Sequence, residues 1–98
     1  MNPTTIKRFR RAMRRHERRA RKWSADLAGT LQAIRAAAER NPEGRAAGRP
    51  ASWARSAREF SRAPWRPHQS RDFWRREAWI LERAADTCAR LRAASLAP

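Results

Sequence analysis

The sequence contains no Val and no Tyr, only three Ile, and no stretch in which apolar and polar residues alternate as in a half-buried strand. This shortage of strand-forming residues argues against a β-sheet, and we expect an all-α protein. Large apolar side chains are also scarce, because 21 Ala supply much of the apolar fraction. A core built from so few large side chains is thinly filled, so self-association into a homo-oligomer stays open as a way to bury more surface.

Cysteine is nearly absent as well. The single Cys88 excludes an internal disulfide and fits a reducing compartment, although a disulfide between two chains stays open, and we expect a buried free thiol. No apolar run reaches the length of a membrane-spanning helix, and no signal-peptide core follows the basic N-terminus. An Arg-rich transit peptide is a poor alternative, because no Ser precedes Trp23. We therefore expect a cytoplasmic protein.

The sequence lacks the known motifs of catalysis and metal binding. His16, His68 and Cys88 are the residues with good transition-metal character, and no two of them have ligand spacing. A nucleophile elbow, a Gly-rich phosphate loop and an informative pair of carboxylates are all missing. We expect no enzymatic activity, no metal site and no cofactor.

Positive charge is what the sequence has in excess. The formal net charge is +15, the isoelectric point is near 12, and the basic residues are 22 Arg and two Lys. Residues 1–22 hold ten basic side chains and one acid, Glu17, whereas residues 23–98 hold fourteen basic and eight acidic ones. A charge of this size favours an anionic partner: nucleic acid, an acidic protein surface or anionic lipid.

One long helix is expected over residues 3–40, with Asn2 as its N-cap, Pro3 in its first position and its end before Pro42. Apolar and small residues recur along it at spacings of three and four, so they form one continuous seam. The seam consists of Ile6, Phe9, Met13, His16, Ala20, Trp23, Leu27, Thr30, Ile34 and Ala37. The opposite side of the first half is basic. Gly29, inside the pattern, predicts either a close approach of another helix or a local bend.

Two further helices are expected. A short helix over residues 52–62 begins with Ser52 as its N-cap, and a last helix runs over residues 69–95. Residues 41–51 contain two Gly, two Pro and no large apolar side chain, which predicts a flexible loop.

These elements predict a single helical domain over residues 1–98. In the simplest architecture the last helix lies antiparallel to the first, and the short helix covers one end of this hairpin. Trp65 lies in the last connection between two prolines, and its role stays open.

Several single residues carry their own predictions. His16 lies on the seam, so we expect it to be partly buried and hydrogen-bonded to a neighbour, with a pH-sensitive packing position as the sharper alternative. Glu77 lies on the apolar sector of the last helix and is expected to pair with an Arg or with His16. Trp79 projects away from that sector and is expected to be exposed, unless an oligomer or the connection over 61–69 covers it. Three Trp on apolar faces are expected in the core: Trp23, Trp53 and Trp74.

Two principal hypotheses of function follow. In the first, the basic face over residues 7–22 lies along nucleic-acid phosphates with little sequence readout, and Trp79 is a stacking group. In the second, the protein is an inhibitor or adaptor, of the kind that phages and other mobile elements encode, and docks onto an acidic patch of a larger host protein. Binding to an anionic membrane surface is a weaker third, because Ala20, Thr30 and His16 dilute the apolar seam. The candidate binding residues are Lys7, Arg8, Arg10, Arg11, Arg14, Arg15, Arg18, Arg19, Arg21, Lys22, Arg75, Arg76, Trp79 and Arg83.

Overall fold

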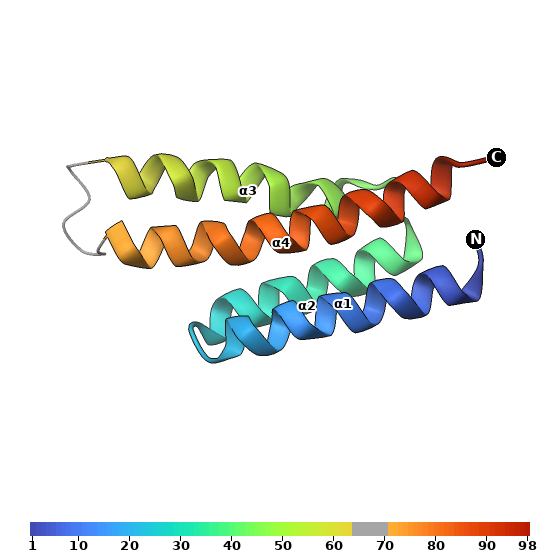
Figure 1. Ribbon diagram of the computed structural model, residues 1–98, viewed down its shortest axis with the longest axis horizontal. Helices are drawn as coiled ribbons and strands as arrows, with labels where there is room; N and C mark the ends of the chain where they lie inside the picture. Colours follow the sequence, from blue (N-terminus) through green and yellow to red (C-terminus); the bar gives the residue numbers. More distant parts are fainter. Residues whose placement is uncertain (64–70) are drawn as a thin grey trace.

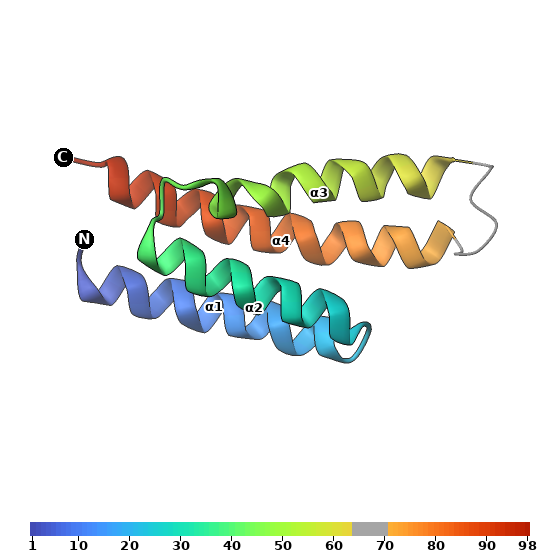
Figure 2. The same ribbon diagram turned by 180° about the vertical axis from the view of Figure 1, so that it is seen from behind.

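The computed structural model describes residues 1–63 and 71–98, and its regular structure over these ranges is helical, which confirms the all-α prediction. The helices are α1 (Pro3–Arg21), α2 (Ala25–Arg40), α3 (Arg45–Arg62) and α4 (Arg71–Leu96). They run alternately in opposite directions and form two helical hairpins, α1/α2 and α3/α4 (Figure 1). The reverse view shows the same two hairpins packed lengthwise against each other (Figure 2).

The single helix predicted over residues 3–40 is wrong, because the chain turns back after Arg21. The backbone N–H groups of Trp23 and Ser24 both donate to the carbonyl of Ala20, at 2.9 and 2.6 Å. Ser24 then caps α2, since its side-chain oxygen accepts from the Leu27 N–H at 3.2 Å. The turn places α2 beside α1, and the apolar faces of both helices join a core that they share with α3 and α4.

The core lies between the hairpins and is filled by many small side chains. The buried apolar residues are Phe9, Met13, Ala20, Leu27, Ala28, Leu31, Ile34, Ala38, Ala47, Ala54, Ala57, Ala78, Ile80, Leu81, Ala84, Cys88 and Leu91. Trp23 and Trp74 pack against this core while staying partly buried, which agrees with their predicted placement. Trp53 is 38% exposed, so its predicted place in the core is wrong.

Helix α3 is longer than the helix predicted over residues 52–62, because it already begins at Arg45. Pro50 lies inside it, where a proline removes one backbone hydrogen bond and disfavours the helical conformation of the residue before it. The Pro50 side chain is fully buried, and Ala47 and Ala54 on the same side are buried as well. Packing of this face therefore offsets the local penalty that the sequence pattern signals.

Other local predictions fare unevenly. The loop expected over residues 41–51 spans only 41–44, where the Gly44 N–H donates to the carbonyl of Asn41 at 3.0 Å. Gly29 faces open space, since a Cβ added there would meet nothing within 4 Å, so the predicted close approach is wrong. The last helix is confirmed as α4, although the first two positions of its predicted range lie outside the described residues, as do Trp65 and His68.

A buried ion pair joins α1 to α2. Arg35 donates from Nε and Nη2 to the two carboxylate oxygens of Glu17, at 2.7 and 3.3 Å. The Arg35 and Glu17 side chains are 15% and 6% exposed. Arg10 and Glu39 form a second and more exposed pair between the same helices, at 2.9 Å. The two pairs together fix how α2 is aligned along α1.

Replacing Glu17 by Ala should leave the Arg35 charge buried without its partner. We expect the free energy of unfolding to fall by about 3–5 kcal/mol, measured by urea denaturation followed by circular dichroism. The matched control is Glu39→Ala, which breaks the more exposed pair and should cost less than about 1 kcal/mol. Equal losses in the two variants would contradict a special role for the buried pair.

The break between α1 and α2 predicts opposite results for two serines. Ser24→Ala removes the cap of α2 and should cost about 1 kcal/mol of stability. Ser52→Ala should be neutral or slightly stabilising, because Ser52 lies within α3 and Ala favours helix more than Ser does. Urea denaturation of both variants measures the difference. A costly Ser52→Ala beside a harmless Ser24→Ala would instead favour the helix boundaries that the sequence alone predicts.

Candidate functional site

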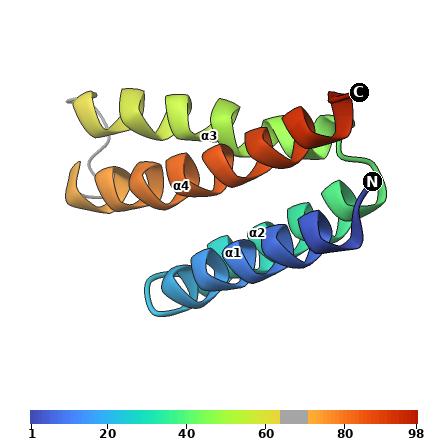
Figure 3. The ribbon, with the colours of Figure 1, turned by 45° about the vertical axis from the view of Figure 1, so that its right-hand side comes forward.

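Basic residues spaced seven apart form one row on α1 and one on α4, because seven residues make nearly two helical turns. The rows are Arg8 and Arg15 on α1 with Lys22 at its C-cap, and Arg76, Arg83 and Arg90 on α4. Helix α4 lies between α3 and α1 and runs antiparallel to α1 (Figure 3). The two rows therefore face each other in opposite order along one shallow channel, which we call the cationic groove. Each row extends for roughly 21 Å.

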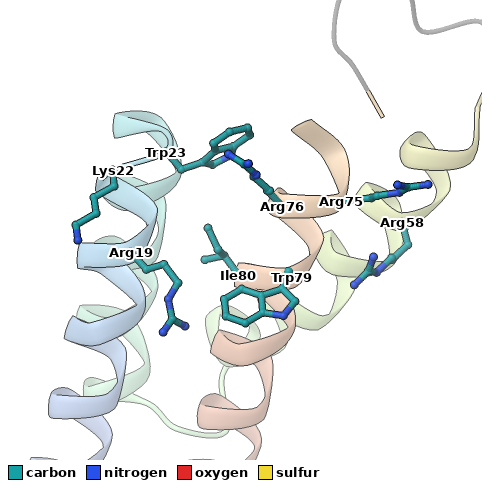
Figure 4. A pocket seen from close by; sticks show the side chains of 8 residues that line it. All are labelled: Arg19, Lys22, Trp23, Arg58, Arg75, Arg76, Trp79 and Ile80. Atoms are coloured by element: carbon teal, nitrogen blue, oxygen red, sulfur yellow. The ribbon is translucent and has the colours of Figure 1, made fainter. Parts of the chain in front are cut away.

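The groove contains two hollows. One, of about 520 Å³, lies near the α1/α2 turn and is called here the Trp79 hollow (Figure 4). It is lined by the cations Arg19, Lys22, Arg58, Arg75 and Arg76 and by Trp23, Trp79 and Ile80. The other, of about 560 Å³, is called the Arg90 hollow, and its basic lining residues are Arg8, Arg11, Arg15 and Arg90.

Acidic residues are distributed unequally over the surface. Among the residues that the structure describes, neither hollow of the cationic groove is lined by Asp or Glu. Two further hollows, both bordered by α3 and α4, do contain carboxylates. These are Asp26 and Glu77 in one, and Glu59, Glu82 and Asp86 in the other. The cationic groove thus differs from both of these hollows, because one is lined by two acids without a cation and the other by three Arg together with three acids.

Trp79 joins the two walls of the groove. Its side chain is 40% exposed, which confirms the predicted exposure. The guanidinium carbons of Arg19, from α1, and Arg83, from α4, lie 4.7 and 4.3 Å from the centre of its ring. Arg83 Nη1 also donates to the Trp79 carbonyl at 3.2 Å. The electron-rich ring attracts both cations and so holds two like charges close together.

Trp23 forms the other aromatic wall of the Trp79 hollow. Arg76 lies over its ring at 4.8 Å, and the Phe73 ring packs against it at 5.2 Å. Burial raises the pKa of Glu77, an effect that its contact with Trp23 opposes, although the buried indole N–H does not reach hydrogen-bond geometry. Glu77 forms no ion pair with a described residue, so its predicted pairing with an Arg or with His16 is wrong.

His16 lies between the two hollows and is half-buried, as predicted. Its Nε2 lies 2.9 Å from the Thr87 hydroxyl, which in turn donates to the carbonyl of Arg83 at 3.1 Å. Because the hydroxyl proton is used there, Thr87 accepts from His16, and the neutral ring carries its proton on Nε2. Burial lowers the pKa of His16, and the four nearby cations lower it further: Arg19, Arg15, Arg83 and Arg90.

Some of the predicted binding residues already form ion pairs within the protein and are therefore less available to a ligand. Arg10 is held by Glu39 on the α2 side, and Arg75 lies 3.6 Å from Asp72. Lys7, Arg14, Arg18 and Arg21 are exposed but line neither hollow. The predicted residues in the hollows that form no ion pair with a described residue are Arg8, Arg11, Arg15, Arg19, Lys22 and Arg76.

The sequence prediction missed several lining residues. Arg90 could have been found, because it lies seven residues after Arg83 on the same helix face. Arg58 could not, and its charge is neutralised by Glu82, which accepts from its Nε and Nη2 at 2.9 and 2.7 Å. Trp23 and Ile80 were assigned to apolar faces without a prediction that they also border the groove.

Other kinds of site find no support in the described ranges. No group of three or more His, Cys, Asp and Glu side chains there could hold a metal ion, and none of the helices there is long and apolar enough to cross a membrane. Cys88 is free and buried, and burial raises its thiol pKa to about 11, which disfavours the reactive thiolate. Comparison of the chain with protein-family models, curated proteins and solved structures gives no match.

The lowered pKa of His16 predicts that stability depends on pH. In the unfolded chain its pKa is near 6.5, so the unfolded state takes up the proton first as the pH falls. Stability should therefore decrease as the pH drops below about 6.5 and level off below the folded-state pKa. His16→Gln keeps a donor for Thr87 and should remove this component. The measurement is the difference between wild-type and variant unfolding free energies from pH 7.5 to 5, and a constant difference would contradict the prediction.

Proposed function

We propose that this protein is a non-enzymatic nucleic-acid-binding protein whose cationic groove holds the phosphate backbone with little sequence specificity. The observation that carries the proposal is the pair of cationic rows that face each other across α1 and α4, in hollows lined by no described carboxylate. Like charges held face to face repel each other, and a polyanion between them would remove that repulsion.

The shape of the groove favours an extended polyanion over a small anion. Its rows repeat roughly every 10 Å along the helices and continue for about two repeats. Their side chains are almost all Arg, whose planar guanidinium forms paired hydrogen bonds to phosphate oxygens. Contacts of this kind fix the position of a backbone but do not read its sequence. The exposed cations outside the hollows, Lys7, Arg14, Arg18 and Arg21, would add long-range attraction.

An acidic surface of a larger host protein is the alternative partner. Trp53 and Trp79 are 38% and 40% exposed, and Trp and Arg dominate the energetics of many protein interfaces. In that case the protein would be an inhibitor or adaptor of the mobile-element type. We propose a cytoplasmic location in either case, because a buried free thiol at Cys88 fits a reducing compartment.

Neutralising the Arg90 hollow tests the proposal without disturbing Trp79. The variant replaces four cations by Gln: Arg8, Arg11, Arg15 and Arg90. We expect affinity for a mixed-sequence oligonucleotide to fall at least about tenfold at ~0.1 M salt, because four phosphate contacts are lost. The plot of log K against log salt concentration should also become shallower by about 3, measured by fluorescence anisotropy.

The matched control replaces four exposed cations of α3 by Gln: Arg45, Arg49, Arg55 and Arg62. It has the same net charge as the groove variant, so it separates the effect of losing the groove cations from the effect of lowering the net charge. Circular dichroism should show unchanged helix content in both variants. Equal losses of affinity in the two variants would mean that the groove is not the site. Wild-type protein that binds no oligonucleotide, yet retains a protein from nuclease-treated lysate, would favour the host-protein alternative.

A further inference from the structure

The Trp79 hollow has a feature that phosphate binding does not require, an apolar and aromatic floor. Trp23, Trp79 and Ile80 face the cavity between α1 and α4, and the indole of Trp79 reaches the surface (Figure 4). Phosphates gain nothing from such a floor, since they stay hydrated or bind to charged groups. A planar ring that can lie on an apolar surface does gain from it.

Cations that are not neutralised by a described carboxylate border this apolar floor and can meet a negatively charged ligand. Arg19, Lys22 and Arg76 form no ion pair with a described residue, whereas Arg58 is neutralised by Glu82. A surface on which a ring stacks, beside cations that meet a phosphate, is the arrangement by which proteins hold unpaired nucleotides. The hollow of about 520 Å³ is also of the size that encloses a small ligand.

The two guanidiniums over Trp79 are compatible with such a ligand. Arg19 and Arg83 lie 4.7 and 4.3 Å from the ring centre, so a base can either displace one of them or stack on its plane. A guanidinium that leaves the ring is then free to form hydrogen bonds to a phosphate of the same strand. The ring and the two cations thus act together on one nucleotide.

We propose, on the basis of the function proposed above, that the Trp79 hollow takes up an unpaired base, so that the protein prefers single-stranded nucleic acid to duplex. In a duplex the bases are stacked inside the helix and only phosphates and groove edges are accessible. A duplex would leave the apolar floor in water. Binding through phosphates alone would instead favour the duplex, because its charge density is higher.

The test compares three 20-nucleotide probes at equal salt: a single strand of mixed sequence, an abasic strand with the same phosphates, and the duplex. Base–aromatic stacking contributes about 1–3 kcal/mol per base, so the ordinary strand should bind about 5- to 150-fold more tightly than the abasic strand. It should also bind more tightly than the duplex. Quenching of tryptophan fluorescence should accompany the ordinary strand and be weaker with the abasic one. This comparison uses the unaltered protein.

Two variants locate the effect. Trp79→Leu keeps an apolar side chain but removes the ring, and should reduce the ratio between ordinary and abasic strands to about twofold or less. Trp53→Leu removes an equally exposed ring on α3 and should keep the ratio. Trp79→Phe keeps a smaller aromatic ring on which a base can stack. It should therefore retain part of the ratio that Trp79→Leu loses. Urea denaturation of each variant confirms that it is folded.

The outcomes separate this inference from the function on which it rests. Equal affinity for ordinary and abasic strands, or tighter binding of the duplex, would overturn the preference for unpaired bases and leave phosphate binding in place. A preserved ratio in folded Trp79→Leu would overturn the assignment to this hollow. Failure of all three probes to bind would overturn nucleic-acid binding itself.

Discussion

Repulsion between the facing basic rows of α1 and α4 is the constraint that the rest of the structure has to satisfy. Three features hold these helices together. Beneath the groove, buried side chains such as Phe9 and Leu91 supply apolar contact. Across it, Trp79 attracts a cation from each helix, and His16, whose pKa is lowered by burial and by the surrounding cations, forms a hydrogen bond with Thr87. The groove can therefore stay cationic without pushing its own walls apart.

The sequence predicts which faces are buried far better than where helices end. The apolar seam of residues 3–40 is real, but it continues in phase across the turn at 22–24. One continuous helix and a helical hairpin therefore show the same spacing of apolar residues in the sequence. Ser24 is a typical N-cap residue and so indicates a helix start, but the unbroken apolar pattern favours one continuous helix. Pro50 predicted a loop where the structure has a helix, because the sequence pattern contains the local penalty of a proline but not the burial along α3 that offsets it. Only contacts between distant segments decide both cases.

The candidate site, like the fold, can be predicted from the sequence only in part. Charge segregation on α1 and the outward direction of Trp79 are properties of single helices, and both could be predicted from residue spacing. Which cations are neutralised depends on partners far away in the chain: Glu39 for Arg10 and Glu82 for Arg58, at separations of 29 and 24 residues. No local pattern contains that information. The facing of the two rows likewise depends on the antiparallel packing of α1 and α4, which the sequence suggested only as the simplest arrangement.

The placement of the few acids therefore defines the surface more than the many Arg do. Glu17 and Glu39 are used between α1 and α2, and Glu82 is used mainly for Arg58 of α3, with a looser contact of 3.5 Å to its neighbour Arg83. The pairs of Glu17 and Glu39 fasten α1 to α2, and the pair of Glu82 with Arg58 fastens α3 to α4 at the border of the Trp79 hollow. The groove is what remains when the available carboxylates have been committed elsewhere. A ligand that supplies negative charge there also relieves the charges that lower the pKa of His16, so its binding and the protonation of His16 should favour each other.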